Sequence, residues 1–76
     1  MKIVRTLVVE TGADRECVQR KISASGSVEE TGAIDGNRIL VKMWDQTISG
    51  LRQKERSIRN TEGVKGCTIL KTQYMP

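Results

Sequence analysis

The sequence VEETGAIDGNRILVKMW (residues 28–44) predicts a β-hairpin in the middle of the chain. Its turn, Asp35-Gly36-Asn37, is the strongest turn signal in the sequence, because an Asp-Gly pair tolerates the positive φ angles of a tight hairpin. Residues 28–34 before the turn form a weak strand, which is polar and contains a glycine. Residues 38–44 after it are mostly apolar and predict a strong strand.

On the N-terminal side of the hairpin, the sequence predicts a strand followed by a helix. Residues 2–10 (KIVRTLVVE) are rich in β-branched residues, which favour a strand. We expect the helix to begin with Thr11 as its cap, three residues before the acidic Asp14, and to end near Gly26. Apolar residues recur along it at helical spacing, at Ala13, Cys17, Val18 and Ile22.

On the C-terminal side, a second helix and a last strand follow. Asp45 or Thr47 can cap the helix, which should end between Asn60 and Gly63. Its apolar line consists of Ile48, Leu51 and Ile58 and is interrupted by Glu55. Residues 64–74 (VKGCTILKTQY) then predict a strand that is half polar.

The predicted order is strand, helix, strand, strand, helix, strand. With right-handed crossovers this order produces an α+β, ferredoxin-like βαββαβ sandwich, in which two helices cover one face of a four-stranded antiparallel sheet. The first and third strands are central in this fold, and they are the two most apolar segments here. The second and fourth are edges, as their polar residues and glycines indicate.

Length and composition limit the function. The 76 residues predict a single domain, 1–76, with a thin core. The chain has no histidine, no Cys-x-x-Cys pair and no glycine-rich phosphate loop, so we expect no enzyme, no catalytic residue, no metal and no cofactor. The net charge of +4 fits either an acidic partner or a solvated surface of mixed sign.

Two cysteines are too few for a disulfide scaffold, and the sequence shows no signal peptide. We therefore expect a cytoplasmic protein in which Cys17 and Cys67 are reduced structural thiols, each on the inner or boundary face of its element. No apolar run approaches the roughly 20 residues that cross a membrane, so no membrane association is expected.

Both sides of the central strands are apolar, although two helices can cover only one. One side has Leu7, Val9, Ile39, Val41 and Met43, and the other has Val4, Val8, Leu40 and Trp44. A contiguous exposed apolar patch usually marks an interface. We expect the patch of Val4, Val8, Leu40 and Trp44 to bind a second copy, giving a homodimer or higher oligomer, or to bind a peptide.

Arg52, Arg56 and Arg59 repeat at helical spacing and form a basic stripe on the second helix. Such a stripe can follow nucleic-acid phosphates, which makes nucleic-acid binding a third hypothesis. Alternatively it is a solvated helix face, in which Glu55 pairs with Arg52 or Arg59. RNA-binding sheets of this fold stack bases on aromatic side chains, and this chain has only Trp44 and Tyr74.

More than half of the chain resembles the effector-sensing domain of the leucine-responsive regulator family, which also exists in stand-alone form. The matching positions are Val28, Gly36, the run 39–43, Ile58-Arg59 and Gly63-Val64. The resemblance implies an oligomer built through its sheets that binds amino acids or similar small effectors. We place the effector site at Gly36, Asn37 and Arg38.

Three segments, TLVVE (6–10), GNRILVKM (36–43) and SIRNTEGVKGCTIL (57–70), resemble a second ferredoxin-like family. It is the small cytosolic chaperone that binds the twin-arginine signal peptide of periplasmic nitrate reductase. Our leading prediction is a non-enzymatic regulatory module that oligomerises through its sheet and senses a small effector. The alternatives are the signal-peptide chaperone and a basic nucleic-acid-binding module.

Overall fold

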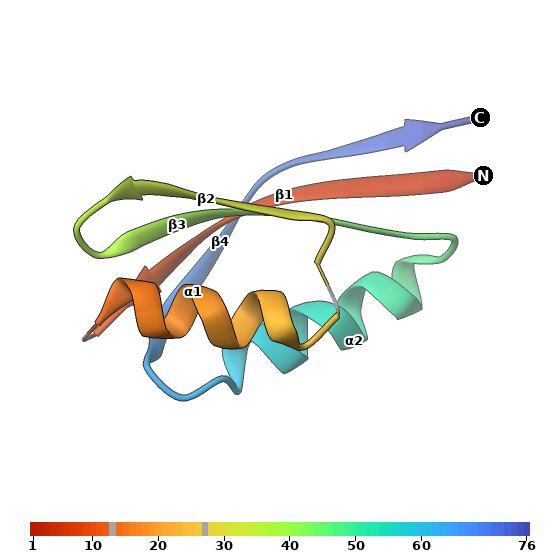
Figure 1. Cartoon of the computed structure of the whole chain (residues 1–76). Coiled ribbons are helices and arrows are strands. Elements are labelled where there is room, and N and C mark those ends of the chain that lie inside the picture. The colour runs from red at the N-terminus through yellow and green to blue at the C-terminus, as the bar shows by residue number, and fades with distance from the viewer. Residues whose placement is uncertain (13, 27) are drawn as a thin grey trace.

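The computed structural model describes residues 1–12, 14–26 and 28–76. Figure 1 shows the strands and helices in the order that the sequence predicts. Their bounds are β1 Lys2–Thr11, α1 Arg15–Ala24, β2 Glu30–Asp35, β3 Arg38–Asp45, α2 Ile48–Arg59 and β4 Val64–Met75. Neither helix among the described residues is long and apolar enough to cross a membrane.

The four strands form one antiparallel sheet in the order β2-β3-β1-β4. Both helices lie against the same face of this sheet and leave the other face open (Figure 1). The ferredoxin-like sandwich is therefore confirmed. The apolar strands β1 and β3 are central, and the more polar β2 and β4 are the edges, because an edge strand needs less apolar surface than a strand with neighbours on both sides.

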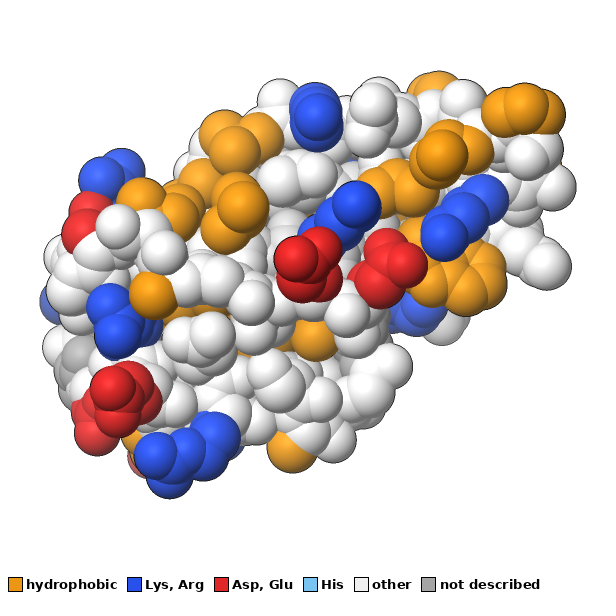
Figure 2. Space-filling model, turned by 45° about the horizontal axis from the view of Figure 1, so that its top comes forward, with side chains coloured by type: hydrophobic (Ala, Val, Ile, Leu, Met, Phe, Trp, Pro, Cys, Tyr) orange, Lys and Arg blue, Asp and Glu red, His pale blue; other side chains and the backbone are white. Residues whose placement is uncertain are grey.

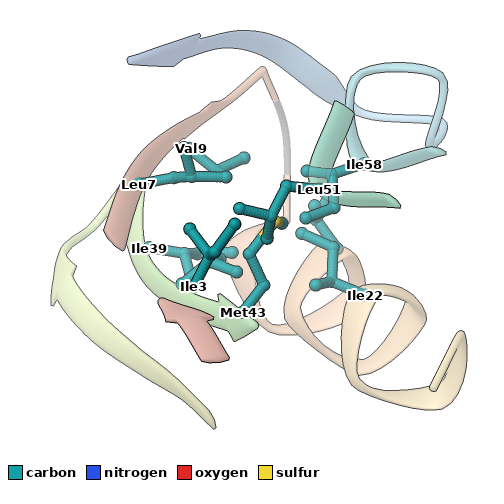
Figure 3. Packing of buried hydrophobic residues seen from close by; sticks show 10 residues of the cluster. Ile3, Leu7, Val9, Ile22, Ile39, Met43, Leu51 and Ile58 are labelled. Atoms are coloured by element: carbon teal, nitrogen blue, oxygen red, sulfur yellow. The ribbon is translucent and has the colours of Figure 1, made fainter. Parts of the chain in front are cut away.

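The hydrophobic core fills the space between the sheet and the two helices (Figure 3). From the sheet it takes alternate residues of the central strands, namely Ile3, Leu7, Val9, Ile39, Val41 and Met43. From the helices it takes Val18, Ile22, Leu51 and Ile58. Of the two apolar sides of the central strands, the side with Leu7 and Ile39 is therefore the one buried beneath the helices.

The start of α1 differs from the prediction. Asp14, not Thr11, is the N-terminal cap, and its carboxylate accepts from the N–H groups of Glu16 and Cys17. Thr11 is the last residue of β1, and both its N–H and its hydroxyl donate to the carbonyl oxygen of Asn37. The prediction was wrong because the strand continues one residue further and uses Thr11 to bind the hairpin. The predicted helix residue Ala13 lies outside the described residues.

The start of α2 uses both predicted residues. Thr47 is the cap, and its hydroxyl accepts from the N–H of Gly50. The carboxylate of Asp45 accepts from the N–H groups of Thr47 and Gln46. The hydrogen bond from Thr47 is the main reason why the pKa of Asp45 lies below its usual value of 3.8.

Two glycines have positive φ angles after the helices, whereas Asp35 and Gly36 do not, so the hairpin turn forms without the positive φ angles that the sequence suggested there. Gly26 follows α1 with φ of 72°, and Gly63 precedes β4 with φ of 93°. A side chain at Gly63 would also collide with Val18 of α1, so the chain can pass this closely only with glycine.

β4 contains an irregularity in its pairing with β1. Leu7 is opposite Ile69, but the next residue, Thr6, is opposite Lys71, so Leu70 is an extra residue in β4. Such a bulge bends a strand and increases its twist. Beyond it, β1 and β4 continue together past the helices, and the two termini lie side by side (Figure 1).

Candidate functional site

The open face of the sheet lies opposite the two helices. Directly opposed residues of antiparallel strands point to the same side, so the pairing register sorts the open face into rows across the sheet. The Leu40 row contains Gly32, Leu40, Val8 and Thr68. The polar row contains Glu30, Lys42, Thr6 and Lys71, and the Trp44 row contains Trp44, Val4 and Gln73.

A hollow of about 320 Å³ lies over the polar row. Its lining consists of Thr6, Glu30, Thr31, Gly32, Leu40, Lys42, Lys71 and Gln73. Gly32 has no side chain, and the space that a side chain there would enter is open, so this part of the sheet surface is not filled. The hollow therefore combines hydrogen-bond donors, one carboxylate and an apolar wall at Leu40.

The four predicted interface residues, Val4, Val8, Leu40 and Trp44, all lie on the open face, but they do not form one continuous patch. The polar row separates Val8 and Leu40 from Val4 and Trp44. Leu40 and Trp44 are each 39% exposed, whereas Val4 is only 3% exposed. Figure 2 shows hydrophobic side chains gathered in two groups on this side, with charged side chains between them.

Trp44, at one end of the open face, lies close to two lysines. The ammonium groups of Lys2 and Lys54 are 4.9 Å and 5.5 Å from the centre of the indole ring. Lys54 also donates to the carbonyl oxygen of Trp44 at 2.6 Å and lies 3.4 Å from the carboxylate of Asp45. Lys2 lies 3.6 Å from the carboxylate of Glu29.

The predicted effector residues Gly36, Asn37 and Arg38 form the tip of the β2–β3 hairpin, away from the hollow. The carbonyl oxygen of Asn37 is occupied by Thr11. The guanidinium of Arg38 pairs with Asp35 at 2.6 Å, and this hydrogen bond is the main cause of a lowered pKa of that carboxyl. The carbonyl oxygen of Asn37 and the guanidinium of Arg38 thus already have partners within the fold, and effector binding here stays a prediction.

The three arginines of the predicted basic stripe have different surroundings. Arg52 and Arg56 are exposed on α2, whereas Arg59 binds the carboxylate of Glu55 at 3.0 Å and the carbonyl oxygen of Cys67 at 3.2 Å. Glu55 is 9% exposed, and its second partner is Arg5 of β1 at 3.4 Å. The acidic residue that interrupts the apolar line of α2 therefore joins that helix to the sheet, and one arginine of the stripe is used in this connection.

Both cysteines are free thiols. Cys67 is half-buried against the core, and this burial raises the pKa of its thiol. The prediction was wrong for Cys17, which is exposed. Its neighbour Val18 takes the inner position on α1, where it packs against the chain at Gly63, so Cys17 is turned outward.

The polar row was missed in the sequence, although Thr6 and Lys42 obey the same alternation as the apolar residues beside them. Lys71 could not have been aligned with them, since the bulge in β4 shifts its register. Within the described residues, no three His, Cys, Asp or Glu side chains come together in a way that could hold a metal ion.

Comparisons with protein-family models and with curated proteins give no match. Two solved structures are similar over most of the chain. The solution structure of the E. coli Tat proofreading chaperone protein NapD is 22% identical with a TM-score of 0.71, and the match covers 97% of this chain and 80% of that one. The structured domain of Drosophila melanogaster Boca is 14% identical with a TM-score of 0.63, over 90% and 96%. At such low identity these similarities show the fold alone, and they agree on the ferredoxin-like sandwich.

Proposed function

We propose that this protein is a chaperone that binds a twin-arginine signal peptide on the open face of its sheet. The main support is the match of nearly the whole chain to the fold of a Tat proofreading chaperone. The same class of chaperone was one of the two families that the sequence resembles. The proposal takes the place of effector sensing as the leading function, because the Asn37 carbonyl and the Arg38 guanidinium of the turn assigned to the effector already have partners within the fold.

The open face offers a peptide both kinds of contact that it needs. Leu40 and Val8 present apolar surface to the hydrophobic part of a signal peptide. Beside them, Lys42 and Lys71 are donors for peptide carbonyl groups, and the carboxylate of Glu30 is an acceptor for an arginine. A hollow of this composition suits a segment that is partly apolar and partly polar better than a fully apolar ligand.

The first test is calorimetric titration with a synthetic twin-arginine signal peptide. We expect micromolar binding, and weaker binding of a peptide in which both arginines are replaced by lysine, because the guanidinium group pairs with carboxylates through two parallel hydrogen bonds. Absence of binding to either peptide would reject the chaperone and return effector sensing to first place.

A pair of variants locates the peptide. Leu40 and Ile69 are exposed to nearly the same extent, 39% and 43%, but they lie on opposite faces of the sheet. Leu40→Ala should weaken peptide binding about tenfold, since truncating an apolar anchor at an interface costs more than 1 kcal/mol. Ile69→Ala should leave binding unchanged. Equal effects of the two substitutions would contradict the open-face location.

Self-association through the same face is a competing use of it. A second copy and a peptide would cover the same apolar residues, so peptide should shift any dimer toward a monomer. Sedimentation velocity with and without peptide measures this directly. A dimer that binds peptide without dissociating would show that the two surfaces are different.

A further inference from the structure

The indole ring of Trp44 already has cations of the protein itself beside it. Lys2 and Lys54 each place an ammonium group within 6 Å of the ring centre. A cation over an indole face is attracted by the negative charge of the ring, and tryptophan is the aromatic residue that does this best. Since Trp44 is 39% exposed, the ring is also accessible from outside.

The two lysines are held differently. Lys54 has a short hydrogen bond of 2.6 Å to the carbonyl oxygen of Trp44 and an ion pair with Asp45. Lys2 has an ion pair with Glu29 at 3.6 Å, in which both side chains are about 40% exposed. An exposed ion pair of this length is weak, because water screens it and two flexible side chains must be ordered. Lys2 is therefore the cation that a ligand can replace.

An arginine fits this position better than lysine does. Its planar guanidinium can stack on the indole ring and at the same time donate two hydrogen bonds to a carboxylate, which the spherical ammonium of Lys2 cannot do. The local charge also permits the exchange. Glu29 and Asp45 balance Lys2 and Lys54 in the free protein, so displacing Lys2 leaves one negative charge for an incoming cation.

We propose that Trp44 and Glu29 form the binding site for an arginine side chain of the signal peptide, and that Lys2 occupies this site until the peptide displaces it. The inference rests on the proposed function and adds the residues that recognise the arginine. It places this arginine in the Trp44 row, next to the hollow that receives the rest of the peptide.

The test uses calorimetric titration of the whole chain with the twin-arginine peptide. Lys2→Met removes the internal competitor and should tighten binding roughly threefold to tenfold, the range expected for one exposed cation–π contact and a weak ion pair. Lys21→Met is the matched control, because the side chain of Lys21 on α1 is 43% exposed, close to the 40% of Lys2, and also lies near one carboxylate, that of Glu62 at 3.7 Å. We expect this control to change the affinity less than about twofold, since salt screens an exposed charge on α1 from a peptide on the opposite face of the sheet.

The opposite changes complete the test. Glu29→Gln and Trp44→Leu should each weaken binding of the twin-arginine peptide roughly threefold to tenfold, and in either background Lys2→Met should no longer tighten it. Both positions are exposed enough for the fold to persist, which circular dichroism verifies, and Glu29→Gln keeps the shape of the side chain.

The outcomes separate the two claims. If wild type binds the peptide but the substitutions at Lys2, Glu29 and Trp44 all leave its affinity unchanged, the arginine site is wrong and the chaperone function stands. The arginine site is also wrong if Lys2→Met and Lys21→Met tighten binding equally, because the effect is then one of net charge. Absence of peptide binding in every variant overturns both claims.

Discussion

The two faces of the sheet are made by alternating residues of the same strands, yet they have different roles. On the covered face, Leu7, Val9, Ile39, Val41 and Met43 are fully buried beneath the helices. On the open face, the polar row interrupts the apolar residues, and neither helix lies over this face (Figure 1). The covered face is therefore expected to determine stability, and the open face to determine what the protein binds.

The largest expected effect comes from truncating a residue of the covered face. Leu7→Ala should lower the free energy of unfolding by about 2–5 kcal/mol, since it leaves a cavity among residues that cannot fully close around it. Leu40→Ala on the open face should lower it by no more than about 1 kcal/mol, because water already reaches that side chain. Denaturant unfolding measures both, and similar losses would mean that the faces do not differ as described.

A second effect on the covered side concerns the return of the chain from α2 to β4. Gly63→Ala should cost about 1–3 kcal/mol, because the residue has φ of 93° and its new methyl group would meet Val18. Gly26→Ala is the matched control, with φ of 72° but open space around it, and should cost only about 1 kcal/mol. If Gly26→Ala costs as much as Gly63→Ala, the close packing at Val18 contributes nothing.

A smaller effect is expected at the rim between the faces, where Asp45 joins β3 to α2. The pKa of Asp45 is lowered in the folded protein, mainly by the N–H of Thr47, so its carboxylate stabilises the fold above the usual pKa of 3.8. This stabilisation is lost as the pH falls through the lowered folded value. Asp45→Asn should therefore be less stable than wild type near neutral pH, and the difference should shrink as the pH falls below that of an ordinary carboxyl group. A difference that is constant with pH would contradict this.

The smallest expected effect is a difference in the reaction rates of the two cysteine thiols, which reports on how exposed each thiol is. Cys17 should react with a thiol reagent as fast as a free exposed thiol. Cys67 should react several-fold more slowly, because its half-buried position limits access and its raised pKa lowers the fraction of reactive thiolate. Single replacements by serine assign each rate, and equal rates would show that β4 opens readily.

Much of the fold was predictable because its signals are local. The turn at Asp35-Gly36 and the mostly apolar residues 38–44 led to the hairpin, and the order of elements then determined the sandwich. The predicted cap of the first helix was wrong because both Thr11 and Asp14 are residue types that can cap a helix, and the structure uses Asp14. The hydroxyl of Thr11 can cap a helix, but strand pairing placed it beside Asn37.

The candidate site was less predictable because it depends on contacts between distant segments. Lys2, Glu29 and Trp44 come from β1, the residues before β2, and β3. No pattern within one segment brings them together. The alternation of β1 and β3 did place the four apolar residues on one face, but the contiguous patch expected of them was wrong because the polar row separates them.

The most direct test of the account is methyl NMR during titration with the twin-arginine peptide. Val8 and Leu40 have methyl groups on the open face, whereas their sequence neighbours Leu7 and Val41 have theirs in the core. The account predicts that the signals of Val8 and Leu40 shift with peptide concentration, while those of Leu7 and Val41 move little. Shifts confined to the core methyl groups, or to residues of α2 beside Arg52 and Arg56, would contradict peptide binding on the open face.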